Sequence, residues 1–309
     1  MILVFPGQGS QKPGMAKDLV DAFPEAKDVF DRADAALGMS LSTLCFDGPA
    51  DALTQTHNAQ PALLAHSAAV WAVVKHHIAT KVTGASGHSL GEFSAYHAAG
   101  SLPLEDALRL VRTRGQLMYE TGQRIPGAMA AILGQPTRTV EEICAEASPA
   151  GVVVPANYNG VEQIVISGEV PAVERAMELA KQYGAKKVLR LQVSGAFHSP
   201  LMQPAAEGLS AALDAARWRD PSMPVWSNVT GEAIGDAATA KMLLLQQLTS
   251  PVRWVEIVRS MAATFPGATF VEMGTGQILS GLVRRLAPDC QTLTCGTVAE
   301  IEALLKGAT

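Results

Sequence analysis

The sequence is poor in cysteine, in aromatic residues and in clustered positive charge, and each shortage excludes a class of protein. The 4 cysteines form no CxxC pair, which argues against a structural zinc site or a dense disulfide framework. Aromatic residues make up only 5%, and 24 Lys+Arg stand against 29 Asp+Glu without a basic block. We therefore expect a protein from a reducing compartment that binds no metal and no nucleic acid.

Long hydrophobic segments are also missing. No run approaches the roughly 20 apolar residues of a membrane span. The apolar start, residues 1–5, is short and has no positively charged region before it, unlike a signal peptide. The longest apolar stretch, residues 59–74, contains Gln60, Pro61 and His66, and we predict a buried helix there. A cytoplasmic protein without a membrane span is expected.

The remaining composition is that of a folded α/β protein. Hydrophobic residues form 48% of the 309 residues, and this length suits two domains, or one large domain with an insertion. Strand and helix patterns alternate, which predicts a mostly parallel sheet covered on both faces. In the larger part, strands are predicted at residues 1–5, 81–86, 224–227 and 268–273, and helices at residues 92–99, 103–121, 251–264 and 277–286.

The pattern of elements changes between residues 126 and 193. Strands are predicted there at residues 128–133, 152–156, 163–167 and 187–192, with helices at residues 137–147 and 171–183. This strand-helix-strand-strand-helix-strand order is the ferredoxin-like arrangement. We therefore predict a small ferredoxin-like subdomain over residues 126–193, inserted into a larger catalytic domain made of residues 1–125 and 194–309.

A serine flanked by glycines follows the strand predicted at residues 81–86. Residues 87–91 read Gly-His-Ser-Leu-Gly and match the G-x-S-x-G pattern of a nucleophile elbow. The glycines in such a turn leave room for a sharp strand-to-helix reversal that exposes the serine hydroxyl. Ser89 is therefore a candidate nucleophile, and a plain glycine-rich turn is the alternative.

A serine hydroxyl needs a base nearby, and His198 has the most favourable position among 7 histidines. It lies between a predicted strand and a predicted helix, and loops at the carboxyl ends of parallel strands converge on one site. His66 and His97 lie in apolar helical stretches and are expected to be core residues. The side chain of His88 is expected to point away from the serine. No Asp or Glu is distinguished as a third triad member.

Arg114 occupies an unusual position on the helix predicted at residues 103–121. On a helical wheel it falls in the apolar sector, between Ala107 and Leu110. Burying an unpaired guanidinium is costly, so Arg114 needs an anionic partner. That partner is either an acid on a neighbouring element or a substrate carboxylate held by two parallel hydrogen bonds.

Two glycine turns follow predicted strands, at residues 7–9 and 274–276. Both lack the third glycine of a dinucleotide fingerprint, and the sequence has no phosphate-binding loop. A glycine turn after the first strand can instead supply a backbone N–H to an oxyanion hole.

Taken in order, these motifs resemble the malonyl-CoA:acyl-carrier-protein transacylase family over nearly the whole chain. The matching segments are residues 5–11 (FPGQGSQ), 60–62 (QPA), 87–92 (GHSLGE), 114–118 (RGQLM), 156–159 (ANYN), 163–168 (QIVISG), 195–199 (GAFHS), 247–254 (QLTSPVRW) and 272–277 (EMGTGQ). The family fold, a hydrolase-like α/β domain with a ferredoxin-like insert, agrees with the predicted organisation. Phe93, where many relatives have tyrosine, is a small departure.

The resemblance implies a set of catalytic roles. Ser89 would be acylated, with His198 as its base. The backbone carbonyl of Gln247 would orient the histidine, which accounts for the missing triad acid. The backbone N–H groups of Gln8 and Leu90 would form the oxyanion hole.

The resemblance also implies a substrate and a reaction. Arg114 would hold the malonyl carboxylate, Met118 and Phe197 would line the acyl pocket, and the Gly195–His198 run resembles the malonyl-selecting form of the family. The implied enzyme, an acyl-carrier-protein S-malonyltransferase, moves malonyl from malonyl-CoA to the phosphopantetheine thiol of acyl carrier protein in two half-reactions. It would feed fatty acid synthesis, need no metal or other cofactor, and act as a cytoplasmic monomer.

Several alternatives stay open from the sequence. They are a free-standing polyketide acyltransferase with another carrier or acyl unit, a serine acyl hydrolase, and an inactive module that binds carrier proteins. Because carrier proteins are usually acidic, a basic docking surface is expected, although ordinary solvated charge explains the same residues equally well. The candidates for that surface are Lys186, Lys187, Arg190, Arg284 and Arg285.

Overall fold

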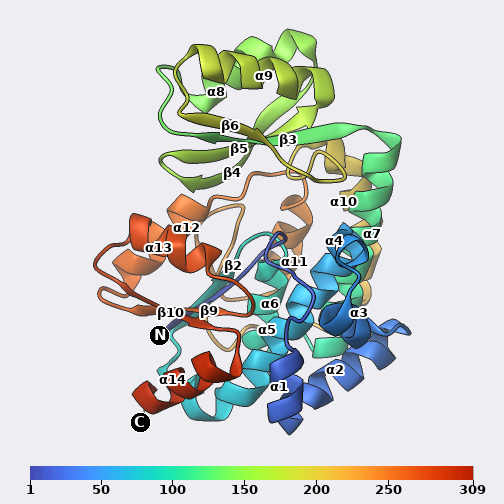
Figure 1. Ribbon diagram of the computed structural model, residues 1–309, viewed down its shortest axis with the longest axis vertical. Coiled ribbons are helices and arrows are strands. Elements are labelled where there is room, and N and C mark those ends of the chain that lie inside the picture. Colours follow the sequence, from blue (N-terminus) through green and yellow to red (C-terminus); the bar gives the residue numbers. More distant parts are fainter. Residues whose placement is uncertain (309) are drawn as a thin grey trace.

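The computed structural model describes residues 1–308 of the chain (Figure 1). The strands are β1 Ile2–Phe5, β2 Gly84–Gly87, β3 Gly127–Leu133, β4 Val153–Gly160, β5 Gln163–Glu169, β6 Lys187–Arg190, β7 Val225–Trp226, β8 Ala233–Ile234, β9 Thr269–Met273 and β10 Gln291–Cys295. The α-helices are α1 Lys17–Ala22, α2 Pro24–Leu37, α3 Leu41–Asp47, α4 Ala50–Thr54, α5 Thr56–Ile78, α6 Gly91–Ala98, α7 Leu104–Arg124, α8 Val140–Ala147, α9 Val170–Gln182, α10 Gln203–Ala215, α11 Ala237–Gln246, α12 Trp254–Thr264, α13 Ile278–Leu286 and α14 Val298–Ala308. Within this described part, no helix combines the length and the apolar character that crossing a membrane requires.

The strands form two separate sheets. The larger has the order β10-β9-β1-β2-β7-β8, and its neighbouring strands are parallel except for the β7–β8 pair. The smaller has the order β4-β5-β3-β6 and is antiparallel throughout. The predicted α/β fold with a mostly parallel sheet is therefore confirmed, and a second, antiparallel sheet accompanies it.

The central strand β1 explains why the chain begins with a continuous apolar run. All four residues of β1 are buried, because helices cover both faces of the parallel sheet. Leu3 and Phe5 pack into the core that includes α2, α5 and α7, whereas Ile2 and Val4 pack on the other face against α12 and α13. The carboxyl end of β1 thus emerges between two packed layers, beside the end of β2.

The antiparallel sheet lies at the top of Figure 1, with α8 and α9 on its outer side. Its elements follow one another as β3-α8-β4-β5-α9-β6, which is the order predicted for this segment. Ile132 of β3 and Ile166 of β5 pack against Ile143 of α8 and Leu179 of α9 in a core of their own. The small sheet and its two helices therefore share a separate hydrophobic core.

Backbone contacts at two places join the small sheet to the rest of the protein, and side chains of β3, β4 and β5 add further contacts. The chain enters the small sheet after α7 and leaves it after β6. The entering and leaving segments are in close contact at Gly122 and Ser194, where a Cβ on Gly122 would lie 2.0 Å from the carbonyl oxygen of Ser194. At the second contact, β4 pairs with the segment before α12. The N–H of Tyr158 donates to the carbonyl of Val252 at 2.9 Å, and the N–H of Val252 donates to Ala156 at 2.9 Å.

Several predicted boundaries were wrong by a few residues. β2 begins at Gly84 and not at residue 81, because residues 79–81 form a 3₁₀ turn that ends α5. α8 begins at Val140 and not at residue 137, because Thr139 and Glu142 form a reciprocal capping box at the start of that helix. The elements β8, β10, α11 and α14 were not predicted.

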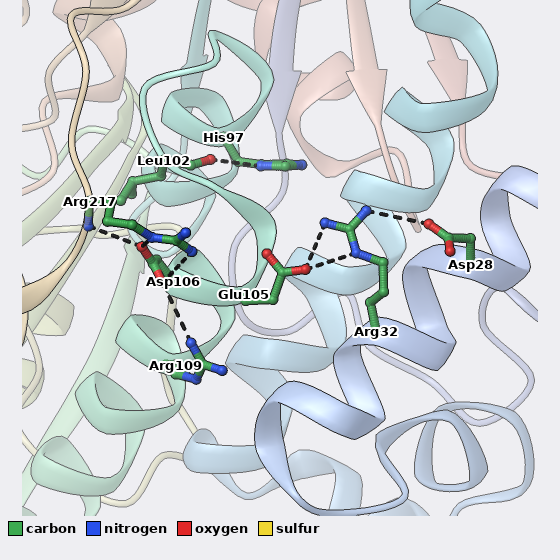
Figure 2. A network of polar contacts seen from close by, with 8 residues as sticks. All are labelled: Asp28, Arg32, His97, Leu102, Glu105, Asp106, Arg109 and Arg217. Atoms are coloured by element: carbon green, nitrogen blue, oxygen red, sulfur yellow. Dashed lines mark hydrogen bonds and ion pairs between the residues drawn. The ribbon is translucent and has the colours of Figure 1, made fainter.

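The N-terminal end of α7, the helix that carries Arg114, is held by ion pairs (Figure 2). Glu105 binds Arg32 of α2 at 2.7 Å, and Asp106 accepts from two nitrogens of Arg217 at 2.8 and 3.2 Å. Both acids lie in the first turn, where negative charge also interacts favourably with the helix dipole. These contacts fix the start of α7 against α2 and against the segment that follows α10.

The second glycine turn joins β9 to α13 and has a structural role. Glu272 of β9 is fully buried, and its carboxylate accepts from the N–H of Ser280 at 2.7 Å and from that of Leu279 at 3.1 Å. Those N–H groups belong to the first turn of α13, where the helix itself supplies no carbonyl to accept from them. An internal carboxylate therefore occupies the position where a nucleotide phosphate would bind.

We predict that Glu272→Ala lowers the free energy of unfolding by about 3 kcal/mol, because two buried helix N–H groups lose a charged acceptor. Urea-induced unfolding at neutral pH measures the change. The control is Glu302→Ala at an exposed position of α14, for which we expect a change within about 0.5 kcal/mol. Equal losses in the two variants would contradict the capping role.

Candidate active site

Ser89 lies in a sharp turn between β2 and α6. Its φ of 53° is in the left-handed region, which costs a residue with a side chain free energy. Close backbone contacts enforce this turn. A Cβ on Gly87 would lie 2.0 Å from the carbonyl oxygen of Gly91, and a Cβ on Gly91 would lie 2.1 Å from that of Phe5. Both glycines of the predicted elbow are therefore required by the space available.

Asn228 holds the strained turn from the neighbouring strand. It follows β7, and its Oδ1 accepts from the N–H of Ser89 at 2.7 Å while its Nδ2 donates to the carbonyl of Gly87 at 2.7 Å. One amide side chain thus binds both sides of the turn. Sequence reasoning missed Asn228, although a polar pair directly after an apolar strand at the carboxyl edge of the sheet was an available signal.

His198 meets the serine as predicted. The Ser89 hydroxyl lies 2.8 Å from His198 Nε2, and the ring is buried. On its other side, Nδ1–H donates to the backbone carbonyl of Gln247 at 2.9 Å and to that of Ser250 at 3.2 Å. Two carbonyls therefore orient the imidazole and leave Nε2 as an acceptor for the serine proton.

The environment keeps His198 neutral. Burial lowers the pKa of the imidazole from 6.5 to about 3, and the positive charge of Arg114 acts in the same direction. A neutral imidazole can accept the serine proton, and the low pKa preserves that form in mildly acidic solution. The pair has the geometry of a nucleophile and its general base.

Arg114 is buried beside the same serine. Its side chain is 1% exposed; Nη2 donates to Ser89 Oγ at 3.0 Å and to Gln247 Oε1 at 2.8 Å, and Nη1 donates to Gln60 Oε1 at 2.7 Å. Among residues 1–308 no carboxylate forms an ion pair with it. The alternative of a direct salt bridge to a neighbouring acid is therefore wrong, and a position for an external anion remains.

A cavity of about 490 Å³ unites most of the predicted residues. Its lining includes Gln8, Ser89, Leu90, Arg114, Met118, Phe197 and His198. Gln247 lies behind the cavity and is fully buried. In the described part of the chain, the backbone N–H groups of Gln8 and Leu90 donate to no backbone carbonyl.

The other histidines named from the sequence have structural contacts. His66 and His97 donate to the backbone carbonyls of Gly296 and Leu102 at 2.8 and 2.9 Å. His88 lines the serine cavity, and its Nε2 lies 2.7 Å from Asn159 Oδ1 on β4.

Three of the basic residues proposed for docking gather in one groove. Lys186, Lys187 and Arg285 line a cavity of about 670 Å³ between the small sheet and α13. The other two candidates, Arg190 and Arg284, are bonded to Glu174 and Thr292. Glu162 also lines this groove, which therefore has three basic side chains against one acidic one and shares no lining residue with the serine cavity.

Comparison with known proteins places the chain among acyltransferases. Residues 2–286 match the sequence profile of the family described as acyl transferase domain. A malonyl CoA-acyl carrier protein transacylase from Bacillus subtilis (strain 168) is 45% identical, with 98% of this chain and 95% of that protein covered. The solved acyl-carrier-protein-S-malonyltransferase from Bartonella henselae is 45% identical with a TM-score of 0.95, and 99% of this chain and 98% of that one are covered. A malonyl-transacylase solved in complex with its type II PKS acyl-carrier protein is 38% identical with a TM-score of 0.93, and 99% of each chain is covered.

We predict that a fluorophosphonate inactivates the protein by reacting with Ser89, at a rate that stays constant from about pH 8 to about pH 5. The reason is the depressed pKa of His198, which remains a base well below its ordinary value of 6.5. Mass spectrometry of the adduct measures the rate.

His198→Ala should slow the fluorophosphonate reaction by about 100-fold or more. The control, His77→Ala at the exposed end of α5, should leave it unchanged. A rate that halves near pH 6.5 would contradict the neutral, buried histidine.

Proposed function

The chain belongs to the acyl transferase domain family, and we propose that it transfers malonyl from malonyl-CoA to the phosphopantetheine thiol of an acyl carrier protein. The observation that carries this proposal is the buried guanidinium of Arg114, 3.0 Å from Ser89 Oγ and without an ion-pair partner among the described residues. A three-carbon acyl group on that oxygen would bring its distal carboxylate to the guanidinium. The malonyl transacylases that the chain resembles support the same substrate.

In the first half-reaction, Ser89 attacks the thioester carbonyl of malonyl-CoA. His198 Nε2 accepts the hydroxyl proton as the Oγ–carbon bond forms, and the N–H groups of Gln8 and Leu90 stabilise the oxyanion. The carbon–sulfur bond then breaks, and the histidine returns the proton to the CoA thiolate. Malonyl-serine remains, with its carboxylate on Arg114.

In the second half-reaction, the carrier thiol replaces CoA. His198 takes the thiol proton, the sulfur attacks the malonyl-serine ester, and the same oxyanion hole stabilises the intermediate. When the ester bond breaks, the proton returns to Ser89 Oγ. All proton transfers use His198, so the proposed reaction needs no metal or other cofactor.

The acyl pocket has one charged wall and apolar neighbours. Arg114 supplies the charge, and Met118 and Phe197, both nearly buried, narrow the space around the acyl group. An acyl group without a distal carboxylate would leave the guanidinium desolvated and without an anion. This difference is the proposed source of selectivity for malonyl.

We assign the smaller sheet with α8 and α9 to a ferredoxin-like subdomain, inserted into a hydrolase-like catalytic domain. The antiparallel order β4-β5-β3-β6 with both helices on one face supports the assignment. Met129 of β3 and Asn157 of β4 line the serine cavity, so this subdomain would form one wall of the substrate site. One chain supplies every proposed site residue, and we propose a cytoplasmic monomer.

The carrier protein would approach the groove lined by Lys186, Lys187 and Arg285, whose positive charge suits an acidic partner. We propose a carrier of fatty acid synthesis. A polyketide carrier is the second candidate, because the chain also resembles a transacylase solved with a type II PKS carrier protein. Transfer rates to one carrier of each kind distinguish the two.

We predict that Ser89→Ala abolishes covalent labelling by radioactive malonyl-CoA, because the acyl acceptor is absent. Labelling is measured by precipitation of the protein without a carrier present. Wild-type protein should retain one malonyl group per chain, and the label should pass to added carrier protein. Stoichiometric labelling of the alanine variant would refute the assignment of the nucleophile, and rapid release of malonate from the wild type would favour a hydrolase.

We predict that Arg114→Ala lowers kcat/KM for malonyl-CoA by about 100-fold or more, and that for acetyl-CoA by less than about 5-fold. Only malonyl carries the carboxylate that the guanidinium binds. Arg112→Ala is the matched control, since this neighbour on α7 bonds to the backbone of His57 at 2.6 Å, outside the cavity. Equal losses for the two acyl groups would return Arg114 to a structural role.

A further inference from the structure

Glu92 is a buried carboxylate that the proposed reaction does not use. It lies in the first turn of α6, three residues after Ser89, and none of its surface is exposed. Its Oε2 accepts from Gln247 Nε2 at 2.7 Å and from the N–H of Asn228 at 3.0 Å, whereas Oε1 has no hydrogen-bond partner among residues 1–308. Burying a carboxylate costs free energy unless hydrogen bonds or an opposite charge stabilise it.

The amide of Gln247 links Glu92 to Arg114. Its Nε2 donates to Glu92 and also to the carbonyl of Ser89 at 3.0 Å, so both amide hydrogens are engaged on one side. The opposite atom, Oε1, therefore faces Arg114 and accepts from Nη2 at 2.8 Å. Without the acceptor at Glu92, the amide would lose the shorter of the two contacts that fix this orientation.

The charges of Glu92 and Arg114 influence each other without contact. Burial raises the pKa of Glu92 to about 7, and the guanidinium opposes that rise. Burial lowers the pKa of Arg114 to about 10, and Glu92 opposes that fall. Arg114 therefore remains a cation at neutral pH. A carboxylate paired with it directly would compete with a substrate for the same N–H groups.

We propose that Glu92 is a positioning residue that sets the preference for carboxylate-bearing acyl groups: it fixes the Gln247 amide, which holds the Arg114 guanidinium beside Ser89. The guanidinium is held by the amide oxygen and keeps further N–H groups for the substrate. This inference rests on the proposed malonyl transfer. Beyond that function, it identifies Glu92 as the residue that positions Arg114, the arginine proposed to bind the substrate carboxylate.

Two conservative variants of Glu92 distinguish the effect of its side-chain length from the effect of its charge. Glu92→Asp keeps the charge but withdraws the carboxylate by one methylene, beyond hydrogen-bond distance of the Gln247 amide. Glu92→Gln keeps an acceptor oxygen at the same distance but removes the charge. The measurement is kcat/KM for malonyl-CoA and for acetyl-CoA with a carrier protein as acceptor, expressed as the ratio of the two.

We predict that Glu92→Asp lowers the malonyl-to-acetyl ratio by about 10-fold, whereas Glu92→Gln stays within about 3-fold of the wild type. Glu272→Ala is the control, because it removes another fully buried carboxylate, on β9, which β1 separates from β2, and should reduce stability without changing the ratio. Gln247→Leu should lower the ratio as Glu92→Asp does, and the double variant should lower it no further, since both changes break the same link.

An unchanged ratio in Glu92→Asp, with both substrates slowed equally, would overturn the proposal and leave Glu92 a support for the turn through Asn228. A fall of the ratio in Glu92→Gln equal to that in Glu92→Asp would also overturn it, because charge and not position would then be responsible. A wild-type enzyme that prefers acetyl-CoA would instead refute the proposed function. The malonyl-to-acetyl ratio of the wild type is therefore measured before any variant is made.

Discussion

Burial of the Arg114 guanidinium without a carboxylate in contact constrains the whole site. A buried cation must be solvated by the protein, and here amide oxygens of Gln60 and Gln247 do so at 2.7 and 2.8 Å. Each amide is itself held, Gln60 by Thr56 at 3.0 Å and Gln247 by Glu92 at 2.7 Å. The arginine therefore requires a surrounding shell of polar groups, and this shell reaches from α5 to α11.

The same shell supports two residues in strained backbone conformations. Ser89 and His198 both have positive φ, at 53° and 57°, which is uncommon for residues with side chains. Asn228 and two glycines hold the serine, and the carbonyls of Gln247 and Ser250 hold the imidazole. Strain at both reacting residues is sustained because hydrogen bonds from several elements determine the same geometry.

Local patterns were enough to predict Ser89, His198 and Arg114. The glycine spacing identifies the turn, the position after a strand identifies the histidine, and the helical wheel identifies the misplaced cation. The hydrogen-bond partners of Asn228 and Glu92 could not be predicted this way, because they are more than 130 residues away in the sequence.

The attachment of the small sheet has a mechanical consequence. It is joined to the rest of the protein where the crossing at Gly122 meets Ser194, and again where β4 pairs with Val252. Further contacts lie between these points, because Met129 of β3 and Val165 of β5 pack into the core of the larger part and Asn159 of β4 bonds to His88 at 2.7 Å. Because Met129 of β3 and Asn157 of β4 line the serine cavity, the contacts that attach the small sheet also fix the wall of the cavity opposite the parallel sheet.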